Sequence, residues 1–194
     1  RHYYQVLQEA KLEKPTTVVD PNSPMEANVL NWFYQTTFWN KNKSRIEFFP
    51  QFQLGKYLKQ LDRRYNHPHY KVDFLLIYAD ELGEQHKIII EYDGFYEHFK
   101  IIDEVNEINY WRYYSDDDIY REKVLESYGY RFLRINRFNI GKDPIQTLDK
   151  RIASLVKPRN GNHEIVHNIH ETIEGLSEGE MKEWMLVKAY NPAK

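Results

Sequence analysis

Two apolar runs separated by a polar turn constrain the fold of this chain more than any other feature. Val72–Tyr78 and Lys87–Tyr92 each read as a β-strand, and together they predict an antiparallel hairpin within a sheet. Acidic residues interrupt both runs where a core strand is normally apolar. Asp73 stands near the start of the first run, and Glu91 and Asp93 close the second.

The hairpin geometry predicts that these acids meet. The start of the first strand and the end of the second lie at the same end of an antiparallel pair, and residues two apart on a strand project from the same face. We therefore expect Asp73, Glu91 and Asp93 to converge. Clustered carboxylates repel one another, and a hard divalent cation such as Mg²⁺, which Mn²⁺ can replace, would relieve that repulsion. The alternative interpretation is a set of strand-end acids that simply face solvent.

The first half of the chain shows clear element boundaries. Ser23-Pro24-Met25-Glu26 has the N-cap, N1 and N3 residues of a helix start, and apolar residues recur at helical spacing as far as Phe38. Ile46–Leu54 predicts a strand that ends at Gly55. Residues 56–69 read as a polar, basic connection.

The second half alternates helix and strand. Residues 95–115 are aromatic and acidic and receive no assignment. A helix is expected over Asp116–Tyr128, a strand over Tyr130–Asn136, and a further helix from Asp143-Pro144 to about Val156. The whole order predicts an α/β domain with a mixed central sheet flanked by helices.

Composition and charge limit the class of protein. The 194 residues are 41% hydrophobic and 29% charged, which is a globular balance, and no apolar run is long enough to span a membrane. Cysteine is absent, which excludes disulfides and thiolate metal sites. The net charge of −2 means that a nucleic-acid partner would need a local basic patch. Three parts are expected: an N-terminal extension over residues 1–22, a domain over residues 23–157, and a linker with a small helical appendage over residues 158–194.

An ordered series of motifs resembles the PD-(D/E)XK nuclease superfamily over roughly residues 23–156. It is most similar to the very short patch repair endonucleases and to related bacterial endonuclease-like domains. The residues that carry the resemblance are Gln51, Gly55, Val72-Asp73-Phe74, Ile90-Glu91-Tyr92-Asp93-Gly94, His98, Asp118, Arg121, Leu125, Gly129-Tyr130, Leu133 and Arg134.

The resemblance implies a restriction-endonuclease-like core and metal-dependent hydrolysis of phosphodiester bonds, in DNA more than in RNA. It also implies a bacterial, cytoplasmic protein that forms part of a larger repair, defence or mobile-element protein. Asp73 matches the metal-bridging aspartate and Glu91 the second metal ligand. Glu26 matches an acid that holds a metal or its bound water, although a capping box alone also explains it.

The resemblance departs from the superfamily pattern at one catalytic position. Asp93 stands where the superfamily usually has a lysine, as it does in the close relatives, and it adds to the metal-binding acids. Gln51, His98 or a second metal ion are the candidates to replace that lysine.

Basic side chains before Asp73 and after His98 are the candidate nucleic-acid contacts. A solvated loop and surface ion pairs are the competing interpretations, and the later arginines would alternatively brace the acidic residues. The candidates are Lys56, Lys59, Arg63, Arg64, Lys71, Arg121 and Arg134.

Two other functions remain open at this point. One is a catalytically silent nucleic-acid-binding or scaffolding module on the same fold, which the missing lysine favours. The other is a phosphate-ester hydrolase that acts on small nucleotides.

Overall fold

The computed structural model describes residues 12, 14–15, 18–19 and 23–157. The predicted appendage over residues 158–194 lies outside the described residues, as does most of the predicted extension over residues 1–22. Within the described part, no helix is both long enough and apolar enough to cross a membrane.

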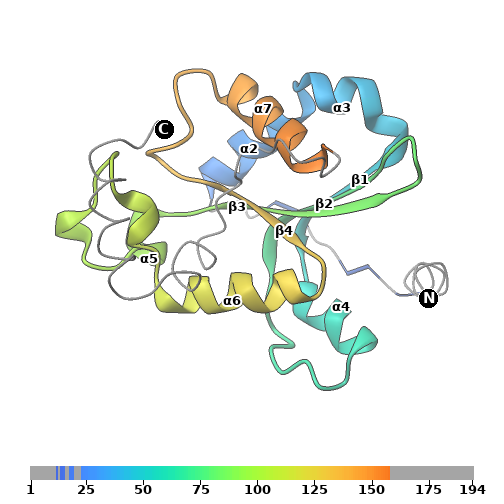
Figure 1. Ribbon diagram of the computed structural model, residues 1–194, viewed down its shortest axis with the longest axis horizontal. Helices are drawn as coiled ribbons and strands as arrows, with labels where there is room; N and C mark the ends of the chain where they lie inside the picture. The colour runs from blue at the N-terminus through green and yellow to red at the C-terminus, as the bar shows by residue number, and fades with distance from the viewer. Residues whose placement is uncertain (1–11, 13, 16–17, 20–22, 158–194) are drawn as a thin grey trace.

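A four-stranded mixed sheet forms the centre of the domain (Figure 1). Its strands are β1 (Ile46–Phe52), β2 (Val72–Ala79), β3 (Gln85–Tyr92) and β4 (Arg131–Ile135), in the order β1-β2-β3-β4. The first two pairings are antiparallel, and β3 pairs with β4 in parallel. The predicted hairpin and the predicted mixed sheet are therefore confirmed.

Helices cover both faces of this sheet (Figure 1). On one face lie α2 (Pro24–Tyr34), α3 (Thr37–Asn42) and α7 (Pro144–Val156). On the other lie α4 (Leu54–Leu61) and α6 (Asp116–Ser127). The predicted α/β class, with helices flanking a mixed sheet, is confirmed at this level.

Alternation along the central strands explains why two helical layers are needed. Phe74 and Ile90 pack with α2 and α7, whereas their neighbours Leu75 and Ile89 pack with α4 and α6. Both faces of β2 and β3 are apolar, as their near-continuous hydrophobic sequence requires. Acids at the ends of these strands consequently lie next to a dry core, where a carboxylate is costly to ionise.

The first predicted helix is divided in two. Ser23 caps α2 as expected, since its Oγ accepts a hydrogen bond from the Glu26 backbone N–H at 3.4 Å. Thr36 then ends one helix and begins the next. Its hydroxyl donates to the Phe33 carbonyl at 2.6 Å and accepts from the Trp39 N–H at 3.1 Å. A local hydroxyl thus competes with the helix backbone, which the apolar spacing does not reveal.

The prediction for residues 53–69 is wrong in its first half. The strand ends at Phe52, and α4 occupies the start of the expected basic connection. Gly55 does not end a strand but lies inside α4. A Cβ atom there would stand 2.1 Å from the His67 carbonyl oxygen, so glycine allows the loop to pass directly over the helix.

Short helices and turns occupy residues 95–115, which the sequence left unassigned. They include α5 (Phe95–His98), and Phe99 forms an isolated bridge with Tyr114. Phe99 and Tyr114 are the buried centre of a small aromatic cluster that also holds Phe138. This cluster carries Tyr114 to the end of the sheet where the acids lie.

Candidate active site at the end of the hairpin

The pairing of β2 with β3 ends beside two carboxylates. The last ladder pair joins Phe74 and Ile90. One position further, Asp73 Oδ2 accepts a hydrogen bond from the Tyr92 backbone N–H at 2.8 Å. This bond fixes the Asp73 carboxylate against the end of β3, next to the side chain of Glu91.

Glu91 lies in surroundings that oppose its negative charge. Its side chain is buried, with 7% of the residue exposed. Burial is the main cause, followed by the charges of Asp73 and Asp93, and together they raise the pKa of Glu91 well above its usual range. Arg134 lowers this pKa but does not offset the rise. A cation bound next to two neighbouring carboxyl groups would stabilise their ionised forms and lower the pKa of Glu91.

Tyr70 also contacts the Glu91 side chain, through its hydroxyl group. Its hydroxyl donates to Glu91 Oε1 at 3.3 Å, and the guanidinium of Arg121 lies 4.3 Å from the centre of its ring. Burial, followed by the charge of Glu91, raises the pKa of Tyr70 well above its usual range, so the hydroxyl stays protonated and donates. Arg121, a predicted phosphate contact, is thus placed beside the acidic pair through a cation–π contact.

Asp93 belongs to a different set of contacts. Its Oδ1 accepts from Arg134 Nη1 at 3.0 Å, and its Oδ2 accepts from the Tyr114 hydroxyl at 2.8 Å. Arg134 in turn donates through Nε to Glu122 Oε1 at 3.0 Å. The assignment of Arg134 to phosphate contact is therefore corrected, because this arginine is buried and bridges two internal acids. Its alternative role, bracing the acidic residues, is the one that the structure shows.

His98 forms a hydrogen-bonded pair with Asp118 on α6. Its Nδ1 lies 3.0 Å from Asp118 Oδ2 and 3.6 Å from Asp93 Oδ1. Burial alone lowers the pKa of His98, but the hydrogen bond to Asp118 and the charges of Asp93 and Asp118 outweigh it and raise this pKa. Asp118, named only as part of the motif, therefore fixes the orientation of the imidazole.

Gln51 and Glu26 form a second polar pair at the end of β1. The Gln51 amide donates to both carboxylate oxygens of Glu26, at 3.0 and 2.9 Å. Gln51 has a left-handed backbone, with φ of 46°, and its neighbours in the ladder place it across from Asp73. Such a conformation costs a non-glycine residue roughly 1–3 kcal/mol and is most often kept at functional sites.

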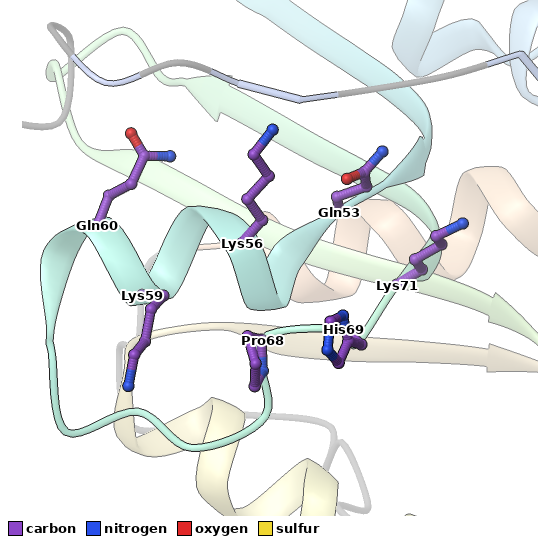
Figure 2. A pocket seen from close by; sticks show the side chains of 7 residues that line it. All are labelled: Gln53, Lys56, Lys59, Gln60, Pro68, His69 and Lys71. Atoms are coloured by element: carbon purple, nitrogen blue, oxygen red, sulfur yellow. The ribbon is translucent and has the colours of Figure 1, made fainter.

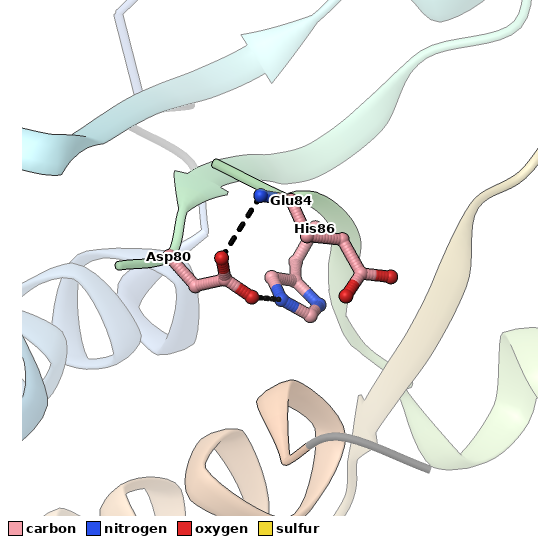
Figure 3. A group of neighbouring side chains, drawn as sticks. All are labelled: Asp80, Glu84 and His86. Atoms are coloured by element: carbon pink, nitrogen blue, oxygen red, sulfur yellow. Dashed lines mark hydrogen bonds and ion pairs between the residues drawn. The ribbon is translucent and has the colours of Figure 1, made fainter. Parts of the chain in front are cut away.

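The predicted convergence of Asp73, Glu91 and Asp93 stays a prediction. Arg134 and Tyr114 hold the Asp93 carboxylate, and the charge of Asp93 still acts on Glu91. Within residues 23–157 and the few described before them, one group of three or more acids or histidines has its ligand atoms all within 4.8 Å of one another. It is Asp80, Glu84 and His86, at the turn end of the hairpin (Figure 3).

The predicted basic contacts are distributed over three environments. Lys56, Lys59 and Lys71 line one pocket (Figure 2). Arg63 and Arg64 lie exposed on the loop after α4, where Arg64 pairs with Asp62 at 3.3 Å. Arg121 and Arg134 are the arginines described above, beside Tyr70 and within the buried acidic set.

Sequence reasoning overlooked two residues of this site. Glu122 follows Asp118 by four residues, so both project from the same face of α6, and this spacing could have marked the face that meets Arg134. Tyr114 gave no such signal, since its contact with Asp93 depends on the path of the aromatic insertion.

Comparison with known protein families, with curated proteins and with solved structures finds no match.

Proposed function

We propose that this chain is a metal-dependent nuclease domain that hydrolyses phosphodiester bonds, in DNA rather than in RNA. One observation carries the proposal: two adjacent carboxyl groups, Asp73 and Glu91, are held at the end of a sheet where Glu91 resists ionisation. The proposal includes the finer assignment of the fold to a restriction-endonuclease-like core, a bacterial cytoplasmic setting, and membership of a larger protein.

The donor set suits Mg²⁺ or Mn²⁺. Mg²⁺ is commonly bound by one or two carboxylates together with water and substrate phosphate, so the pair needs no third acid. Asp73 and Glu91 would hold the ion. Gln51, which lies across from Asp73 in the ladder and donates to Glu26, is the candidate to orient a bound water. The ion would supply a polarised phosphate and a water of lowered pKa.

The protein side chains have separate tasks in this proposal. The Tyr92 N–H orients Asp73, and the Tyr70 hydroxyl orients Glu91. His98, oriented by Asp118, is the candidate to transfer a proton at the leaving oxygen. Asp93, in the position of the usual lysine, instead anchors Arg134 and keeps a positive charge beneath the pair.

A catalytically silent nucleic-acid-binding or scaffolding module is the second candidate. The observation that favours it is the engagement of Asp93 with Arg134 and Tyr114, which occupies both of its carboxylate oxygens without providing a lysine. Such a module would bind nucleic acid without cleaving it.

A plasmid-nicking assay separates these two functions. Wild-type protein should nick supercoiled DNA with Mg²⁺ or Mn²⁺ and not with EDTA. Asp73→Asn should reduce the rate by at least about 10²-fold, because it removes a charged ligand that the transition state needs. Asp80→Asn is the matched control, an acid of the same hairpin at its other end, and should nick at the wild-type rate. Equal rates for Asp73→Asn and wild type would remove the proposed site, and the absence of nicking on DNA and RNA alike would favour the silent module.

A further inference from the structure

A basic pocket lies between α4 and the segment that leads into β2 (Figure 2). Its volume is about 450 Å³, within the range of small-ligand sites. Lysine, histidine, glutamine and proline side chains surround it, and none of the described residues that line it carries a carboxylate. The lining residues are Gln53, Lys56, Lys59, Gln60, Pro68, His69 and Lys71.

The walls of this pocket are held in place by the backbone. The Gly55 N–H donates to the Tyr70 carbonyl at 2.8 Å, and the absence of a side chain at Gly55 lets the His67 carbonyl approach. Lys59 Nζ donates to the carbonyls of Arg63 and Tyr65, at 2.5 and 2.7 Å. Lys59 therefore ties the loop to α4, and its side chain points away from that of Lys56 (Figure 2).

Lys56 and Lys71 remain as the cations of the pocket, with the imidazole of His69 and the amides of Gln53 and Gln60 as further donors. Both lysines and His69 are exposed. A pocket with several N–H donors and no acid lining it selects an anion, and phosphate accepts hydrogen bonds from such groups.

The pocket lies beside the acidic pair along the chain and in the sheet. Lys71 precedes Asp73 by two residues, and Gln53 follows Phe52, which pairs with Val72 in the ladder. Tyr70, adjacent to Lys71, reaches Glu91 with its hydroxyl. A polymer with phosphates at regular intervals could therefore place one phosphate at the pair and another at the pocket, which an isolated nucleotide could not do.

We propose that this pocket is a backbone-phosphate subsite that holds the nucleic-acid strand beside the Asp73–Glu91 pair and selects which phosphodiester bond reaches it. The assignment of the strand to a substrate rests on the proposed nuclease function. Binding at the pocket needs no metal, so it can be measured separately from cleavage.

The test is the anisotropy of a fluorescein-labelled oligonucleotide, single-stranded and duplex, titrated with the full chain in EDTA over a range of salt concentrations. Lys56→Gln/Lys71→Gln should bind on the order of tenfold more weakly at low salt. The slope of log affinity against log salt should fall by about 0.7 per lysine for the single strand and about 0.9 for the duplex. Lys41→Gln/Lys43→Gln, which removes the same charge from the α3 region on the opposite face of the sheet, should bind as wild type does.

Three results would overturn the subsite: no binding by wild type, equal losses in the two double variants, or competition by polyglutamate as effective as that by unlabelled oligonucleotide. Intact binding without nicking by wild type would leave the subsite standing and remove the nuclease function, so the two failures are distinguishable. Equal urea midpoints for the double variants and wild type would show that folding is unchanged.

Discussion

Acidic residues lie at both ends of the β2–β3 hairpin, but the surroundings at the two ends shift carboxyl pKa values in opposite directions. At the turn, Asp80 Oδ1 accepts from the N–H groups of Leu82 and Glu84, each at 2.9 Å, and Oδ2 meets His86 Nε2 at 2.9 Å. The hydrogen bond to His86, helped by these N–H groups and opposed by burial, lowers the pKa of Asp80. At the open end, burial and like charges raise the pKa of Glu91.

Under the proposed function the cation belongs at the open end, although the turn has the larger group of close ligand atoms. The turn group has its atoms within 4.8 Å, yet its aspartate already has the partners that a charged turn requires. The open end has two residues, Asp73 and Glu91, against three at the turn. Glu91 is buried beside another acid, however, and a cation would lower the free-energy cost of ionising it.

Among the substitutions that test this comparison, removal of Arg134 should have the largest effect on the free energy of unfolding. Arg134→Met leaves Asp93 and Glu122 buried without their cation, so the free energy of unfolding should fall by about 3–5 kcal/mol. Urea unfolding followed by circular dichroism measures the loss. Arg64→Met, which breaks an exposed pair with Asp62, is the control and should unfold at the wild-type midpoint. A loss under about 1 kcal/mol for Arg134→Met would mean that this arginine does not hold the open end together.

A smaller effect is expected from Glu91→Gln, and it should depend on pH. Because the pKa of Glu91 is raised in the folded state, the folded protein keeps a proton that the unfolded chain releases above pH 4.5. Wild type should therefore lose stability relative to Glu91→Gln as the pH rises from that value, by up to about 1.4 kcal/mol per pH unit. Urea midpoints of both proteins across this range give the slope. Parallel curves would show that Glu91 ionises normally.

The smallest effect should follow from Asp80→Asn at the turn. The substitution removes a charge whose partners are local backbone groups and His86, so it should destabilise the protein slightly and most at neutral pH, where Asp80 is ionised. It should leave the protection that Mn²⁺ gives against thermal unfolding unchanged. Differential scanning fluorimetry with and without Mn²⁺ measures both quantities. A protection that vanishes in Asp80→Asn would move the metal site to the turn.

Local chemistry allowed much of the fold to be predicted from the sequence. Ser23 with Pro24 and Asp143 with Pro144 mark helix starts by their own hydrogen-bonding capacity, and the apolar runs mark the hairpin. The α4 helix was missed because its lysines suggested a basic loop. Leu54, Tyr57 and Leu58, three and four residues apart, carried the helical pattern that could have revealed it.

The candidate site was less predictable, because its residues form hydrogen bonds with residues that are distant in the sequence. Hairpin geometry brought Asp73 and Glu91 together, but the same reasoning could not foresee that Arg134 on β4 would take Asp93. Nor does a sequence show that Gln51 adopts a left-handed backbone to reach Glu26. These contacts depend on the parallel pairing of β3 with β4 and on the placement of α2, which local patterns do not encode.

Calorimetric titration with Mn²⁺ at neutral pH, in two buffers of different ionisation enthalpy, tests the central claim most directly. Wild type should bind Mn²⁺ and release protons, because the raised pKa of Glu91 favours a proton that a bound cation would displace. Asp73→Asn/Glu91→Gln should abolish binding, and Asp80→Asn/His86→Gln should leave both the affinity and the proton release at wild-type values. Binding that survives the first double substitution and disappears in the second would contradict the account.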